Sequence, residues 1–182
     1  MKPTRERILD AAWTATVQRG WSGITMARLG DAAGVSRQSV YNEFGTKQQV
    51  AEALMAREVG RFLEAVDEQI GNGRTPADSV GRAADAVFTL AADNPLVHAT
   101  LRAAAGSPSP LLPLITSESG PVIDAAVRRV SDGLLQRFPE LAGTPHLHEA
   151  ADAIVRLVIS HVVQPGHRPD MRFVAERLLA PG

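Results

Sequence analysis

Apolar side chains recur at helical spacing along almost all of this 182-residue sequence, and no segment alternates apolar and polar residues as a strand would. The first stripe runs from Ile8 to Val17 and stops at Gly20, a residue type that commonly ends helices. The pattern then resumes repeatedly after short breaks. The sequence therefore predicts an all-α fold of about nine helices.

Capping residues, glycines and prolines mark the ends of these helices. Thr25 and Ser36 are good N-caps, Gly34 follows the second helix, and Thr46 with Gln49 has the spacing of a capping box. After the first stripe we expect helices at 26–33, 36–44, 46–70, 122–138, 146–163 and 169–179, with two more after Thr75-Pro76 and Asn94-Pro95. The clearest loop is 106–110.

Charge is distributed unevenly between the two parts of the chain. Residues 1–50 carry a net charge of +3 and the remainder −4, so only the N-terminal part suits a polyanionic partner. Without cysteine there is neither a disulfide nor a thiolate metal site. No secretory signal and no apolar run of about 18 residues is present, so we expect a cytoplasmic protein with no membrane contact.

The second and third predicted helices are joined by Gly34-Val35, a connection of helix-turn-helix length. Glycine tolerates the positive φ that such a turn requires, and an apolar residue follows it. The exposed side of the third helix would then carry arginine, glutamine and asparagine, which can pair with base edges, and serine and tyrosine, which can contact phosphates. Trp13 and Trp21 are interpreted as packing groups.

The N-terminal residues resemble the DNA-binding domain of TetR-type bacterial transcriptional regulators. The resemblance rests on Ile8–Ala12, Gly20, Ala32–Ser36 and Val40–Lys47. It implies a homodimeric repressor with a DNA-binding domain at 1–48, and an effector-binding and dimerisation domain at 49–182. Three features depart from the family pattern, and the first is Ala15 and Thr16, where the first helix usually carries a large apolar pair. Gly30 stands where alanine is usual, which should loosen its helix by about 1 kcal/mol, and Glu43 receives no contact role.

Carried over residue by residue, the resemblance assigns phosphate contacts to Thr25, Tyr41 and Lys47, and base-facing roles to residues of the third helix. The complete set of DNA-binding candidates is Thr25, Arg28, Ser36, Arg37, Gln38, Ser39, Tyr41, Asn42 and Lys47. The partner of this set is double-stranded operator DNA.

The later helices have more apolar surface than two stacked helices need, and pockets in helical proteins form between such faces. Because aliphatic residues dominate, we expect a small, largely apolar effector. The candidate lining residues are Phe62, Val66, Val87, Phe88, Ala91, Val97, His98, Leu101, Leu112, Ile115, Ile123, Ala126, Val130, Leu157 and His161. A dry core remains open as the alternative for each of them, and His161 favours a satisfied core or interface histidine.

The last two helices are apolar on more than one face, which suits a two-fold contact with a second chain. The candidate interface residues are Ala151, Ile154, Val155, Val158, Val162, Val174 and Leu178. A dimer would hold two recognition helices about 34 to 36 Å apart, the spacing of successive major grooves.

Other classes of function are less well supported. His146, His148 and Glu149 superficially resemble a metal site but imply no third ligand elsewhere, and no phosphate-binding loop or catalytic motif is present. We therefore expect no cofactor, no metal and no enzymatic activity. The alternative is a helical enzyme or binding protein that uses a helix-turn-helix-like fragment only structurally. A DNA-packaging protein would need a stronger positive charge.

Overall fold

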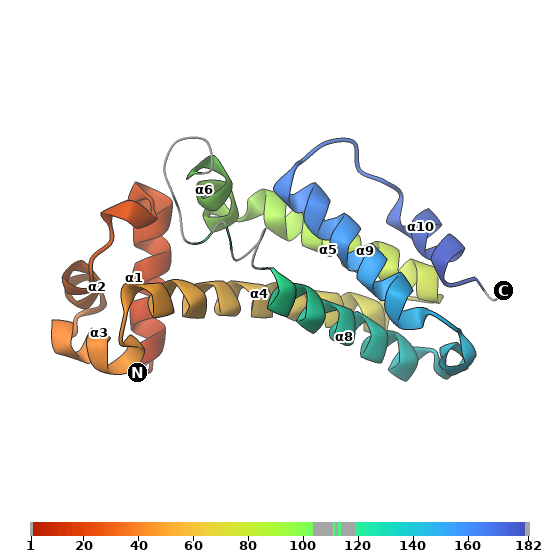
Figure 1. Ribbon diagram of the computed structural model, residues 1–182, viewed down its shortest axis with the longest axis horizontal. Helices are drawn as coiled ribbons and strands as arrows, with labels where there is room; N and C mark the ends of the chain where they lie inside the picture. Colours follow the sequence, from red (N-terminus) through yellow and green to blue (C-terminus); the bar gives the residue numbers. More distant parts are fainter. Residues whose placement is uncertain (1, 104–110, 112, 114–118, 181–182) are drawn as a thin grey trace. The chain divides into compact units, whose positions relative to one another are not determined.

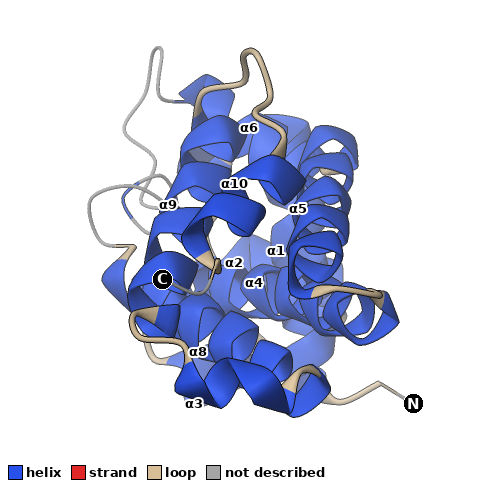
Figure 2. Cartoon of the chain, turned by 90° about the vertical axis from the view of Figure 1, so that its right-hand side faces the viewer, coloured by secondary structure: helices blue, strands red, loops and turns tan. Residues whose placement is uncertain are grey.

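The computed structural model describes residues 2–103, 111, 113 and 119–180. Within these residues all regular structure is helical, with nine α-helices and two short 3₁₀ helices and no strand (Figures 1 and 2). The predicted all-α fold is thus confirmed. The predicted loop at 106–110 lies outside the described residues, whereas Gly120-Pro121 forms the start of a helix.

The chain divides into two compact units that share one long helix. Unit 1 comprises residues 1–58 and 94–117, and unit 2 comprises residues 59–93 and 118–182. In chain order unit 1 contains α1 (Thr4–Arg19), η1 (Trp21–Gly23), α2 (Met26–Ala33), α3 (Arg37–Phe44), the first part of α4 (Lys47–Asn72) and α6 (Pro95–Ala103). Unit 2 contains the rest of α4, α5 (Pro76–Asp93), α8 (Gly120–Arg137), η2 (Pro139–Gly143), α9 (Leu147–Val163) and α10 (Met171–Leu178).

Side-chain caps begin several helices at the expected places. Thr25 accepts a hydrogen bond from the N–H of Arg28, Ser36 from that of Ser39, and Thr46 from that of Gln49, over 3.0 to 3.2 Å. These bonds satisfy backbone donors that a helix start leaves without partners. The capping-box prediction is half confirmed. Thr46 caps the helix, but the side-chain carbonyl of Gln49 accepts from the hydroxyl of Thr46, at 3.1 Å, instead of from its backbone N–H.

Unit 1 is held together by a core in which the faces of α1, α2, α3 and α4 meet. Ile8, Leu29, Val40 and Leu54, from these four helices in turn, are each at most 1% exposed. Leu96 of α6 joins the same core. Burial of large aliphatic side chains supplies most of the driving force for such a small unit, so α3 is positioned by its apolar side.

The core of unit 2 joins the second half of α4 to α5, α8, α9 and α10. Ile70, Val127, Leu134, Ile154 and Ala175 are nearly inaccessible to solvent. A side chain of α8 caps the C-terminal end of α4. The guanidinium of Arg137 donates to the carbonyl oxygens of Gly71 and Gly73, each at 3.3 Å. These bonds satisfy carbonyl groups at the helix end.

Candidate DNA interface

The helix-turn-helix is formed by α2, a tight turn and α3. Gly34 adopts the left-handed conformation (φ 64°, ψ 39°) that ends α2, and the N–H of Val35 donates to the carbonyl oxygen of Gly30 at 2.9 Å. Leu29, Ala33 and Val40 are buried between the two helices. The predicted turn and its small core are therefore present, and they direct the polar side of α3 outward.

Gly30 makes the close approach of α2 to the turn possible. A Cβ atom built on Gly30 would lie 2.8 Å from the carbonyl oxygen of Val35 and 3.2 Å from the backbone nitrogen of Arg37. Both are backbone atoms, so neither can rotate away. The departure from alanine at this position thus has a packing reason, which helix propensity alone does not reveal.

Arg7 holds the same turn from the outside. Its Nη2 donates to the carbonyl oxygens of Ala33 and Gly34, at 3.1 Å in the second case. These carbonyls lie at the C-terminal end of α2, where acceptors lack intrahelical partners and a positive charge is favourable. No role was predicted for Arg7, because no local sequence signal connects it to a turn some 26 residues away.

The outward side of α3 presents the side chains that were expected to face DNA bases. Arg37, Gln38 and Asn42 are exposed, and Tyr41 is 36% exposed. Arg37 donates to the hydroxyl of Tyr41 at 3.2 Å and lies 5.2 Å from its ring centroid, while Gln38 donates to Asn42 at 3.0 Å. The polar side chains form two i, i+4 pairs along one face of the helix.

The remaining candidates lie at the starts of helices. Ser36 bonds to the backbone and the hydroxyl of half-buried Ser39. Thr25 is exposed at the start of α2, and the guanidinium of Arg28 donates to the carbonyl oxygen of Gly23 at 2.8 Å. The side chains of Thr25, Arg28 and Ser36 therefore already take part in local hydrogen bonds.

Lys47 is the first residue of α4 and is half-buried. Its Nζ lies 5.5 Å from the ring centroid of Trp21, which is itself only 5% exposed. Partial burial lowers the pKa of Lys47 from its ordinary value. The packing role expected for Trp21 is confirmed by its burial, and the contact with Lys47 was not anticipated.

A second basic side chain, Arg5, lies at the end of α3. Its Nη1 donates to the carbonyl oxygen of Glu43 at 3.3 Å, and its guanidinium carbon lies 4.5 Å from the ring centroid of Phe44. Arg5 thereby adds a positive charge beside the last turn of α3 and ties α1 to that turn. Sequence reasoning missed it because the contact spans 38 positions.

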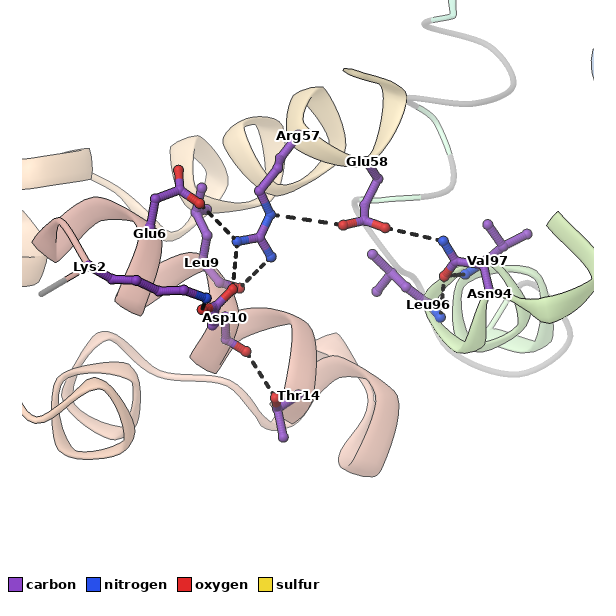
Figure 3. Close-up of polar contacts among 10 residues, drawn as sticks. All are labelled: Lys2, Glu6, Leu9, Asp10, Thr14, Arg57, Glu58, Asn94, Leu96 and Val97. Atoms are coloured by element: carbon purple, nitrogen blue, oxygen red, sulfur yellow. Dashed lines mark hydrogen bonds and ion pairs between the residues drawn. The ribbon is translucent and has the colours of Figure 1, made fainter. Parts of the chain in front are cut away.

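A polar network behind the interface links α1, α4 and α6 within unit 1 (Figure 3). The guanidinium of Arg57 bonds to Asp10 at 2.9 Å, to Glu6 at 3.3 Å and to the carbonyl oxygen of Leu9 at 3.2 Å. The adjacent Glu58 is 3% exposed and forms an ion pair of 3.9 Å with Arg57. Two consecutive residues of α4 therefore connect α1 to the start of α6, where Asn94 contacts Glu58.

Two family models match the chain and together cover most of it. The N-terminal model, described as "Bacterial regulatory proteins, tetR family", matches residues 8–54. The model for the "Bacterial Tetracyclin repressor, C-terminal domain" matches residues 76–180, which is more than half of the chain. The chain belongs to the TetR family. It is a DNA-binding transcriptional regulator, and the enzyme alternative does not hold for this family.

The relatives of this TetR-family regulator include the transcriptional regulator AlkX of Mycobacterium tuberculosis, 34% identical over 166 residues, which span 88% of this chain and 75% of that one. The crystal structure of the repressor AlkX from a Dietzia strain, implicated in biodegradation of n-alkanes, superposes with a TM-score of 0.72 at 26% identity, covering 96% and 92% of the two chains. FadR of Bacillus subtilis, solved in complex with stearoyl-CoA, shares the fold at 18% identity and a TM-score of 0.62, covering 96% and 95%.

The effector-binding candidates of the TetR-family regulator divide between the two units. Unit 2 contains Phe62, Val66, Val87, Phe88, Ala91, Ile123, Ala126, Val130, Leu157 and His161, most of them in or against its core. Val97, His98 and Leu101 belong to unit 1, and His98 is exposed. Leu112 and Ile115 lie outside the described residues. The Nδ1 atom of His161 lies 2.8 Å from the carbonyl oxygen of Leu157, and its ring lies 6.3 Å from that of Phe88, centroid to centroid, in a T-shaped arrangement.

The dimer candidates differ in how much surface they offer. Ala151, Ile154, Val155 and Val158 are buried in the core of their own unit, so they have almost no side-chain area left for a second chain. Val162 and Val174 are half-buried, and Leu178 is 41% exposed. The apolar stripe of α9 thus faces its own chain, because α5, α8 and α10 cover it.

Two further classes of site are absent from the described part of the chain. No described helix is long and apolar enough to cross a membrane. No group of three or more metal-ligating side chains is found in these residues. His146, from the sequence motif considered above, takes up a left-handed conformation (φ 70°, ψ 21°) immediately before α9.

Proposed function

We propose that this TetR-family regulator is a homodimeric repressor that inserts α3 into the major groove of its operator. Arg37, Gln38, Ser39 and Asn42 would face base edges. Thr25, Tyr41 and Lys47 would contact phosphates, with Arg28 and Ser36 at the margin of the interface. The exposure of the α3 side chains, on a helix whose opposite side is anchored in the core, is the observation that carries this proposal.

The chemistry of these side chains fits the proposed division of roles. A guanidinium can pair with the O6 and N7 atoms of guanine, and a carboxamide can pair with the N6 and N7 atoms of adenine. Contacts to phosphates position the protein without reading sequence. We propose 1–48 as the DNA-binding domain and 49–182 as the effector-binding and dimerisation domain.

The proposed dimer joins exposed apolar residues of unit 2. Phe173 and Leu178, both on α10, are 53% and 41% exposed, and half-buried Val162 and Val174 lie on the last two helices. Large exposed apolar side chains on neighbouring turns are typical of contact surfaces. A two-fold contact would present two copies of α3 to successive major grooves.

We propose a small, largely apolar effector that binds in unit 2 and releases the operator. The support comes from the aliphatic character of the residues that meet there and from the relation to AlkX, whose Dietzia homologue is implicated in biodegradation of n-alkanes. The transfer of an apolar effector from water to such surroundings lowers its free energy and so favours binding.

Mobility-shift titrations with DNA from upstream of the gene test the role of α3. Arg37→Ala should cost about 1 to 3 kcal/mol and relax specificity at one base position, whereas Lys47→Ala should weaken all sequences alike and reduce the salt dependence. Arg128→Ala, which removes an exposed charge from α8, is the control and should leave binding unchanged. Unchanged binding in both interface variants would overturn the assignment of α3.

Oligomer and effector are tested separately. A mass measurement that shows a monomer at micromolar concentration would contradict the dimer.

Hexadecane, palmitate and palmitoyl-CoA, added to the protein–DNA complex, distinguish a bare aliphatic effector from one with a charged group. Release by none of them, together with release by a polar metabolite, would overturn the apolar effector.

A further inference from the structure

Trp21 occupies a position in unit 1 where its indole ring is fixed. It begins η1, immediately after Gly20, whose positive φ of 76° turns the chain at the end of α1. Trp21 is 5% exposed and belongs to the same core as Ile24 and Met26. A side chain held this firmly can act as a rigid surface for a neighbour.

That neighbour is the ammonium group of Lys47, which lies 5.5 Å from the ring centroid. The face of an indole ring carries negative electrostatic potential and attracts a cation within about 6 Å. The attraction is stronger where the cation has lost part of its hydration, and Lys47 is half-buried. The two side chains therefore form a directed contact.

The contact holds the ammonium group of Lys47 at a place where the partial charge of the helix start repels it. Lys47 is the first residue of α4, and the start of a helix carries partial positive charge from its unpaired backbone N–H groups. Among the described residues no carboxylate forms an ion pair with Lys47. An aspartate or glutamate partner would orient the ammonium but cancel its charge, whereas an aromatic ring orients it and leaves the charge available for an anion.

We propose that Trp21 is a positioning residue for DNA binding, which holds the ammonium group of Lys47 beside the first turn of α4 so that it meets a backbone phosphate. This inference rests on the phosphate role of Lys47 in the proposed function. It gives the buried indole a task beyond packing, and it makes η1 part of the DNA-binding machinery although Trp21 itself has almost no surface to offer DNA.

Fluorinated tryptophans test this inference without disturbing the core, because ring fluorination withdraws electron density from the face and changes the shape little. The full chain is prepared with Trp13→Phe, so that Trp21 is the only tryptophan. A phosphate contact is sequence-independent, so a random-sequence duplex at low salt serves as the probe. DNA affinity should fall with each added fluorine. The total loss should be about two- to fivefold for each protomer that binds DNA.

The same series in a Lys47→Met background separates the possible outcomes. There, fluorination should leave DNA affinity unchanged, and Trp21→Phe, which keeps an aromatic face, should retain most of the affinity when Lys47 is present. If Lys47→Met alone does not weaken binding, the phosphate role of Lys47 is wrong. If Lys47→Met weakens binding but fluorination has the same effect in both backgrounds or none in either, Trp21 is a packing residue only.

Discussion

The side-chain amide of Asn94 donates a 3.1 Å hydrogen bond to the buried carboxylate of Glu58, while its carbonyl oxygen accepts from the N–H groups of Leu96 and Val97 at 2.9 and 3.3 Å. One side chain thus caps α6 and attaches it to α4 (Figure 3). Through Glu58 the attachment continues to Arg57 and from there to α1. Unit 1 is therefore stabilised by a polar network as well as by its apolar core.

Asn94→Ala should lower the free energy of unfolding by about 2 to 4 kcal/mol, because it removes the cap of α6 and one donor to a buried carboxylate. Urea unfolding followed by circular dichroism measures this loss. Asn94→Asp keeps the capping oxygen but places a second negative charge next to Glu58.

Glu58→Gln in the Asn94→Asp background relieves that repulsion and supplies an amide donor, so the double variant should be more stable than the two single losses together predict. Strictly additive losses would contradict a direct interaction between positions 58 and 94.

Gly30→Ala should destabilise the protein by about 1 to 3 kcal/mol, because the added methyl group meets the backbone of the turn and forces it to shift. The shift should also weaken DNA binding, since the turn sets the direction of α3. Gly60→Ala is the matched control: it lies inside α4, and a Cβ atom there meets nothing within 4 Å.

The control should gain about 0.5 to 1 kcal/mol from the higher helix propensity of alanine. Thermal unfolding and DNA titration of both variants decide the matter. If Gly30→Ala is stabilised as much as Gly60→Ala, the close approach of α2 to the turn has no energetic consequence.

The ionisation of Asp10 should make the stability of unit 1 depend on pH. The hydrogen bond from Lys2, and then that from Arg57, hold the pKa of Asp10 below its ordinary value, although partial burial acts in the opposite direction. Asp10 therefore binds a proton more readily in the unfolded chain than in the folded protein. The free energy of unfolding then rises as the pH rises through the two pKa values of Asp10. The stabilisation is complete above about pH 4 and disappears as the pH falls through the lowered pKa.

Asp10→Asn should remove this part of the pH dependence, and Lys2→Gln should reduce it, as followed by the unfolding midpoint between pH 5 and pH 2. Both effects should be smaller at high salt, because Lys2 and Asp10 are 70% and 43% exposed. An unchanged acid transition in Asp10→Asn would show that the ion pairs of Asp10 do not contribute.

Local signals allowed the helices and the turn of the helix-turn-helix to be predicted. Thr25, Ser36 and Gly34 act on backbone groups within four residues of themselves, so their effect is visible in the sequence. The exposed side of α3 followed from the same periodicity, because Val40 and Phe44 must point to the core. The family models, which match residues 8–54 and 76–180, then showed the family to which the chain belongs.

Contacts across long stretches of sequence could not be predicted in this way. Arg7 at the turn, Arg57 against α1 and Trp21 beneath Lys47 depend on how helices pack, which no local spacing encodes. The face that α9 buries was equally hidden, because that helix is apolar on more than one side and only the packing of α5, α8 and α10 selects the inner one.

The two side-chain pairs on α3 affect how the proposed complex would discriminate between DNA sequences. Arg37 donates to Tyr41 and Gln38 donates to Asn42, so part of the rotamer entropy of these long side chains is already lost before DNA binds. A matching base pair competes with an existing partner and replaces it. At a mismatched base the side chain keeps its bond to its neighbour on the helix and gains nothing, so the preference for the matching site equals the excess of the base contact over that internal bond.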